Sequence, residues 1–288
     1  IVKQPTEKRI YNVKDYVVYP KHGVGKIISI EKAKIGDIDI TFYKVFIEKE
    51  KLTLSIPLNQ QSHLRHISSI NQINKAISNA KEMMDNYSWV LPKWGNWSKD
   101  DYKSNPKTRK YLKEHQMGWD VTDFGLGQFD TMGITLFCIR NGIQGNNNDK
   151  PYAEKLLFMK EGQEIPFHSH KVKLEDIINR GGGELAIEFV EVDENQKEKN
   201  DDIEVLVDGE ILTLSPHEPL ILKRGQSVTV ERNIFHKFYS SKGSGMVMAG
   251  EVSQVNDDNN DNYFLKPVGR FSQIDEDTES NYPLWNEI

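Results

Sequence analysis

Residues 162–185 read GQEIPFHSHKVKLEDIINRGGGEL and hold two histidines and a glutamate at spacings that a metal site can use. His168 and His170 stand two apart, so in a strand their imidazoles would point to the same face. Glu175 follows after a predicted turn and offers an oxygen ligand. His236, which follows Gly225 along the chain, would reach the same place from a neighbouring strand of an antiparallel β-barrel. Three imidazoles and a carboxylate suit Mn²⁺, Fe²⁺, Co²⁺, Ni²⁺ or Zn²⁺, with positions left for substrate or water.

This array of glycines, histidines and glutamate resembles the first conserved motif of the cupin superfamily, and Gly225 and His236 agree with the second. Within that superfamily, four longer strings closely resemble the D-lyxose isomerase family, and the resemblance covers roughly residues 69–288. The strings are GWDVTDFG at 118–125, HSHKVKLEDIINRGGGEL at 168–185, GEVSQVNDDNNDN at 250–262 and PVGRF at 267–271. The resemblance implies a cupin jelly-roll β-barrel that binds Mn²⁺, forms a homodimer and interconverts D-lyxose and D-xylulose, with D-mannose and D-fructose as a second pair.

Such an isomerase moves a proton between adjacent carbons, so it needs a Lewis acid and a base near the carbon-bound hydrogen. Lys173 lies between His170 and Glu175, and we expect a nearby cation and partial burial to lower its pKa. Glu251, in the apolar string GMVMAGEVS, is the second candidate for proton transfer. The alternatives are a solvated loop charge for Lys173 and a structural ion pair for Glu251. Other polar residues of the family-like strings could bind sugar or cap turns, and we leave them outside the site: Asp120, Asp123, Asp257, Asp258 and Arg270.

Two other functions suit the same residues. Three histidines and a glutamate also occur in cupin oxidases and dioxygenases, which would consume oxygen. A sugar-sensing transcription regulator would bind sugar without turnover. The four tryptophans between residues 89 and 119 could stack on a sugar, although core or dimer packing is the commoner role of such side chains.

The amino-terminal part has a different charge and pattern. Residues 1–68 carry 12 basic and 7 acidic side chains, whereas the whole chain has a formal charge of -6. Short β-like runs separated by turn signals at Pro20–Gly25, Gly36-Asp37 and residues 48–51 predict a small, bent antiparallel barrel. The strings VKDYVVYPKHGVGKIISIEK at 13–32 and ITFYKVFIEKEKLTLSIPL at 40–58 resemble the RNA-polymerase-interacting domain of CarD-type regulators, which is a Tudor-like barrel.

That resemblance makes RNA polymerase a candidate partner of residues 1–68, and a spacer barrel is the alternative. DNA binding is not expected, because the module has no cluster of lysine and arginine. Apolar residues at helical spacing, from Ile70 to Met84, predict a helix that opens at about residue 69 behind Ser68 and Ser69 as N-caps. We therefore divide the chain into a barrel over 1–68 and a cupin domain over 69–288 with a leading helical segment.

Composition narrows the class of protein. The mean hydropathy is -0.61, and apolar runs such as Ile134–Ile139 are far shorter than the ~20 residues of a membrane helix. The first ten residues show no apolar leader, so a cytoplasmic location is expected. Cys138, the one cysteine, lies in an apolar run and should be a buried free thiol.

Overall fold

The computed structural model describes residues 10–19, 22–35, 38–66, 72–269 and 280–288. The chain divides into two compact units, which separate between residues 71 and 72. The N-caps expected at Ser68 and Ser69 lie outside the described residues. Within the described part of the chain, no helix has the length and apolar character needed to cross a membrane.

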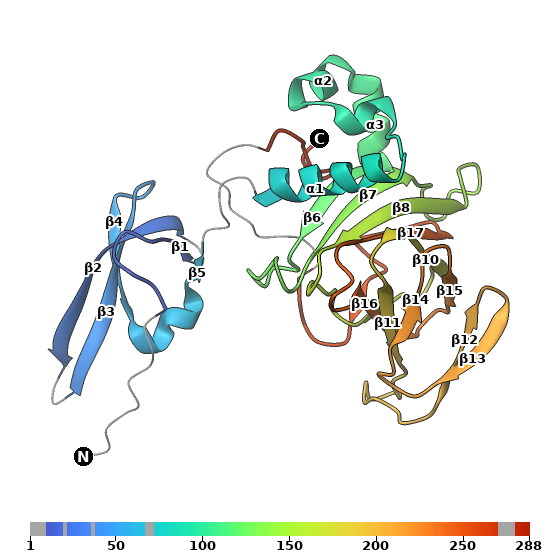
Figure 1. Cartoon of the computed structure of the whole chain (residues 1–288). Helices are drawn as coiled ribbons and strands as arrows, with labels where there is room; N and C mark the ends of the chain where they lie inside the picture. The colour runs from blue at the N-terminus through green and yellow to red at the C-terminus, as the bar shows by residue number, and fades with distance from the viewer. Residues whose placement is uncertain (1–9, 20–21, 36–37, 67–71, 270–279) are drawn as a thin grey trace. The chain divides into compact units, whose positions relative to one another are not determined.

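The first unit is a curled antiparallel sheet (Figure 1) in the order β4-β3-β2-β1-β5. Its elements are β1 (Tyr16–Tyr19), β2 (Gly23–Ile35), β3 (Ile38–Ile47), β4 (Leu52–Pro57), the 3-10 helix η1 (Leu58–His63) and β5 (Arg65–His66). The fully buried side chains of Val17, Ile27, Tyr43 and Val45 form its core. The small, bent antiparallel fold is confirmed.

The second unit is built on two antiparallel sheets. One has the order β13-β12-β15-β10-β17-β8-β7-β6 and the other β14-β11-β16-β9-β18. From β8 onward the chain alternates between the sheets, with β12 and β13 as a hairpin, which is the path of a jelly roll. The strands are β6 (Gly118–Thr122), β7 (Ile134–Arg140), β8 (Tyr152–Met159), β9 (His168–Ser169), β10 (Glu175–Gly182), β11 (Leu185–Val190), β12 (Ile203–Val207), β13 (Glu210–Leu214), β14 (Leu220–Leu222), β15 (Ser227–Val230), β16 (Phe235–Ser240), β17 (Val247–Gln254) and β18 (Tyr263–Phe264).

Side-chain alternation gives the larger sheet two buried faces. Leu136 and Leu157 point between the sheets, where they pack with side chains of the smaller sheet such as Phe189. The next residues in sequence, Phe137 and Phe158, point to the opposite face. Because both faces are covered, β7 and β8 read as nearly continuous apolar runs. The mainly β prediction with a jelly roll is confirmed.

Helix α1 (Gln72–Asn86) covers the outer face of the larger sheet (Figure 1), together with the 3-10 helix η2 (Lys93–Asn96). Helices α2 (Lys99–Ser104) and α3 (Pro106–Glu114) pack in a separate cluster with Cys138 of β7. The buried face of α1 packs against the outward aromatic side chains of the sheet, as its apolar spacing predicts. Four tryptophans belong to this helical side of the unit, which supports packing over sugar stacking: Trp89, Trp94, Trp97 and Trp119. Cys138 is buried as expected, and burial raises its pKa to about 12.

The core between the two sheets should dominate the stability of the second unit. Ile177 on β10 is fully buried there, whereas Ile211 on β13 is 68% exposed. We expect Ile177→Ala to lower the free energy of unfolding by about 2–5 kcal/mol, because it removes buried methyl groups and leaves a cavity. The matched change Ile211→Ala should have little effect. Urea unfolding followed by tryptophan fluorescence measures both, since all five tryptophans lie in the second unit; equal losses would contradict this account.

Candidate metal centre

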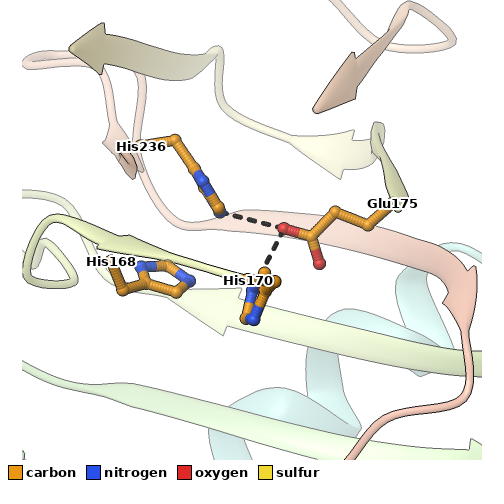
Figure 2. Close-up of side chains that lie close together, drawn as sticks. All are labelled: His168, His170, Glu175 and His236. Atoms are coloured by element: carbon orange, nitrogen blue, oxygen red, sulfur yellow. Dashed lines mark ion pairs between the residues drawn. The ribbon is translucent and has the colours of Figure 1, made fainter. Parts of the chain in front are cut away.

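Pairing between two short strands brings the first histidines together. Strand β9 pairs antiparallel with β16 so that His168 lies opposite His236. Glu175, the first residue of β10, approaches from the other sheet after the turn at residues 171–174. The ligand atoms of His168, His170, Glu175 and His236 all lie within 4.8 Å of one another (Figure 2). The strand expected through His170 ends at Ser169, yet His170 still reaches the cluster.

Backbone carbonyl groups orient the three imidazoles. Nδ1 of His168 lies 3.0 Å from the carbonyl oxygen of Pro166, and Nδ1 of His236 lies 3.1 Å from that of Ile234. Nδ1 of His170 contacts the carbonyl oxygen of Asp261. A carbonyl oxygen only accepts, so each Nδ1 donates, and a neutral ring then carries its lone pair on Nε2. All three rings are held in the tautomer that suits a metal ligand.

The atoms that face one another in the cluster are arranged as a cation would require. Oε1 of Glu175 lies 2.9 Å from Nε2 of His236 and 3.5 Å from Nε2 of His170 (Figure 2). These three buried atoms have no hydrogen-bond partner among the described residues. Burial, together with the imidazoles of His236 and His170, holds the pKa of His168 well below its usual range and so favours its neutral form. A divalent ion would satisfy the converging lone pairs, so the donor set fits a metal.

Lys173 is buried against two carboxylates. Its Nζ lies 2.6 Å from Oε2 of Glu175 and 2.8 Å from Oε1 of Glu251, and only 3% of its side chain is exposed. Burial alone would lower the pKa of Lys173, but the charges of Glu175 and Glu251 outweigh it and raise that pKa. Without a metal ion, the pKa of Lys173 is therefore raised rather than lowered, because of two carboxylate partners that the sequence did not reveal. A solvated loop charge does not describe this residue either.

Glu251 has one occupied and one open carboxylate oxygen. Its Oε1 accepts hydrogen bonds from Lys173 Nζ and, at 3.0 Å, from the Ser253 hydroxyl, and Lys155 Nζ lies 3.5 Å away. In the part of the chain that the structure describes, Oε2 has no partner. Burial raises the pKa of Glu251, but the ammonium groups of Lys155 and Lys173 bring it below its usual value, so the carboxylate is ionised. The side chain combines a fixed orientation with a free acceptor.

A pocket opens over these side chains and has two kinds of wall. Lys155, Lys173, Glu251 and Asp258 line it together with three members of the cluster, His168, His170 and Glu175. Its apolar lining comes from seven residues: Phe124, Ile134, Leu136, Leu157, Ile165, Phe238 and Phe264. Such a site can bind a small polar molecule and place one of its carbons beside an ionised carboxylate.

The sequence prediction missed some residues around the pocket. Lys155 is 4% exposed within the apolar strand β8, where it contacts Asn256 and lies 3.7 Å from Asp258. A lysine in an otherwise apolar run was the available signal, as it was for Glu251. Asp258, which we left outside the site, lines the pocket. Asp261 was also missed, although it lies in the family-like string at 250–262.

Other residues considered from the sequence lie elsewhere. The carboxylate of Asp123 accepts hydrogen bonds from the backbone N–H groups of Gly125 and Gly127, and Asp257 accepts them within its own loop. Arg270 and the side chains of His63 and His66 lie outside the described residues. The remaining histidines pair with carboxylates away from the cluster: His22 with Glu50, His115 with Asp149 and His217 with Glu198.

Comparisons with known proteins agree with both resemblances. Residues 69–288 match the D-lyxose isomerase family, and residues 11–68 match the CarD-like/TRCF RID domain. A D-lyxose/D-mannose isomerase of Escherichia coli O157:H7 is 36% identical over 217 residues, which is 75% of this chain and 96% of that protein. One of Serratia proteamaculans is 44% identical over 173 residues, 60% of this chain and 76% of that protein. The solved L-ribose isomerase of Cellulomonas parahominis with L-ribose has 14% identity and a TM-score of 0.47, covering 72% of this chain and 97% of that one.

The converging lone pairs predict that the cluster binds one divalent ion per chain. We expect His170→Ala to abolish tight Mn²⁺ binding, because it removes one of four ligand atoms and leaves the Glu175 carboxylate short of a partner. His217→Ala is the matched control, since that histidine is exposed and paired with Glu198. Metal content after chelator treatment and reloading measures both; unchanged metal content in His170→Ala would contradict the assignment.

Proposed function

Residues 69–288 belong to the D-lyxose isomerase family, and we propose that this chain interconverts D-lyxose and D-xylulose, with D-mannose and D-fructose as a second pair. The family and the two curated relatives show that the chain is a sugar isomerase. The observation that carries the choice of chemistry is the open oxygen of Glu251 beside the buried ammonium of Lys173 and the candidate metal ligands. A base, a cation and a set of metal ligands are what proton transfer next to a carbonyl group requires.

In this proposal His168, His170, Glu175 and His236 hold Mn²⁺, which their mixed nitrogen and oxygen donors suit, as they do Fe²⁺, Co²⁺, Ni²⁺ or Zn²⁺. The bound ion would act as a Lewis acid on the sugar oxygens. The net charge of the pocket lining also supports a bound cation, because the lining has three carboxylates and only two lysines. The excess of negative charge would disfavour an anionic reaction intermediate unless a further positive charge were bound.

Glu251 is proposed as the base and Lys173 as the cation that stabilises developing negative charge. Oε2 of Glu251 takes the proton from C2 of the aldose, the C–H electron pair forms the C1–C2 double bond, and the carbonyl electron pair moves to O1, which gives an enediolate. The hydroxyl proton of O2 then moves to O1, Glu251 returns its proton to C1, and C2 becomes the carbonyl carbon of the ketose, so no oxidant or reductant is needed. Lys173 remains protonated beside its two carboxylates, and this suits it to steady the enediolate oxygen rather than to remove a proton.

The oxidase and dioxygenase alternative is not favoured, because the matched family and both curated relatives are isomerases. Oxygen uptake during incubation with sugar and metal separates the two classes, since isomerisation consumes none. The homodimer and the cytoplasmic location implied by the resemblance stay predictions.

The proposal is tested by incubating metal-loaded protein with D-lyxose in D₂O. We expect D-xylulose to form only with metal, and solvent deuterium to enter the sugar because the proton passes through a carboxylate that exchanges with water. Glu251→Gln should retain metal and lose kcat by about 10²–10⁴-fold, since an amide cannot accept the proton. Glu204→Gln, an exposed change on β12, is the control. Normal turnover in Glu251→Gln would overturn the assignment of the base.

For the first unit we propose RNA polymerase as the partner, on the support of the match over residues 11–68 to the CarD-like/TRCF RID domain. The unit has its own buried core, so it can act as a separate binding module. Its sheet also presents an edge strand, β4, on which Leu52 is 38% exposed. An exposed edge with an apolar side chain is a plausible contact surface for another protein.

Binding is measured by mixing the full chain with purified bacterial RNA polymerase and separating free from bound protein by size-exclusion chromatography. We expect co-elution that weakens in Leu52→Asp, because the new charge would be desolvated at the contact. Leu206→Asp makes the same change at a leucine of the second unit that is 43% exposed, and it should bind as the wild type does. Absence of co-elution for the wild-type chain would leave the barrel as a spacer.

A further inference from the structure

A single buried aspartate, Asp261, holds four consecutive residues of the candidate site. Its carboxylate accepts the backbone N–H of Lys171 at 2.9 Å, of Val172 at 3.2 Å and of Lys173 at 3.0 Å. Its own backbone carbonyl oxygen accepts from Nδ1 of His170. Asp261 is 4% exposed. The turn that separates a metal-ligand histidine from the buried lysine is therefore bound at every residue from 170 to 173.

The position of Asp261 is itself fixed from both sides. Its backbone N–H donates to the carbonyl oxygen of Asp257 at 3.0 Å within the loop. Two residues after it, Tyr263 on β18 pairs with Ser169 on β9, the residue between the two histidines. Asp261 thus lies just before β18, the strand that pairs with β9 beside the two histidines. A displacement of Asp261 would move His170 and Lys173 together.

We propose that Asp261 is a positioning residue for this centre, which sets both the orientation of the His170 imidazole and the place of the Lys173 ammonium. This inference rests on the proposed function and deepens it. Three backbone N–H groups that converge on one carboxylate form a rigid, charge-assisted clamp. Outer partners of metal ligands commonly change metal affinity by about 10–100-fold when they are altered.

A purely structural role for Asp261 makes a different prediction from a positioning role. Asp193 provides the comparison, because its carboxylate also accepts two backbone N–H groups, those of Asn195 and Lys197, but in a loop away from the pocket. Loss of either carboxylate should lower the stability of the metal-free protein. Only the loss at Asp261 should change the affinity of the site for metal.

The experiment measures Mn²⁺ affinity by competition with a chromophoric chelator, without sugar, in the wild type, Asp261→Asn, Asp261→Glu and Asp193→Asn. In Asp261→Asn an amide NH₂ faces backbone donors, and we expect affinity to fall by about 10–100-fold. Asp261→Glu keeps the charge but displaces it by one methylene, and it should weaken binding less. Asp193→Asn should leave the affinity at the wild-type value.

A second measurement does not depend on metal. Amide hydrogen exchange of residues 171–173 in the metal-free protein should be faster in Asp261→Asn than in the wild type, because the three N–H groups lose their acceptor. Unchanged affinity and unchanged exchange in Asp261→Asn would overturn the inference. The two proposals fail in different ways, because the wild-type affinity tests the metal site, whereas the ratio of variant to wild type and the exchange rates test the role of Asp261.

Discussion

The buried carboxylate of Glu175 is the group around which the pocket is organised. It is 2% exposed, and such a charge is stable only with partners of opposite charge or with a metal. Each of its two oxygens has its own positively charged or metal-ligating partners. One faces the imidazoles of His170 and His236, and the other forms an ion pair with Lys173. The candidate metal ligands and the catalytic candidates therefore share one carboxylate and form a single electrostatic unit.

The electrostatic unit around Glu175 extends to further buried side chains of alternating charge. Lys173 links Glu175 to Glu251, and Glu251 in turn lies near Lys155 on the adjacent strand β8. Glu251 and Lys155 are directly opposite each other in the β17–β8 register, so sheet pairing sets their separation. Because opposite charges alternate along the chain of contacts, each buried ion has a partner. In the proposed reaction, the open oxygen of Glu251 is the point at which this network exchanges a proton with the sugar.

The loop at 256–262 has a larger role than its amide-rich composition suggests. Asn256 and Asp258 meet Lys155 at one end, and Asp261 binds the turn at 171–173 at the other. Three of its residues are nearly fully buried, namely Asn256, Asp258 and Asp261. A polar loop can be buried when its polar groups find partners, and here the partners are the side chains and backbone of the pocket. The first unit has a separate core, so its proposed partner and the sugar site are distinct properties of one chain.

The sequence by itself determined the class of fold and which four side chains were expected to form the candidate metal centre. Alternation of apolar residues marked the strands, helical spacing marked α1, and residue type and spacing predicted that His168, His170, Glu175 and His236 come together. Only the tertiary structure decided that Lys173 is an ammonium ion between two carboxylates, and that Lys155 and Asp261 belong to the site. Lys173 and Glu251 lie 78 residues apart, and Lys171 and Asp261 lie 90 apart. Contacts at such separations depend on strand register and on how two sheets face each other, and no local pattern of residues encodes that geometry.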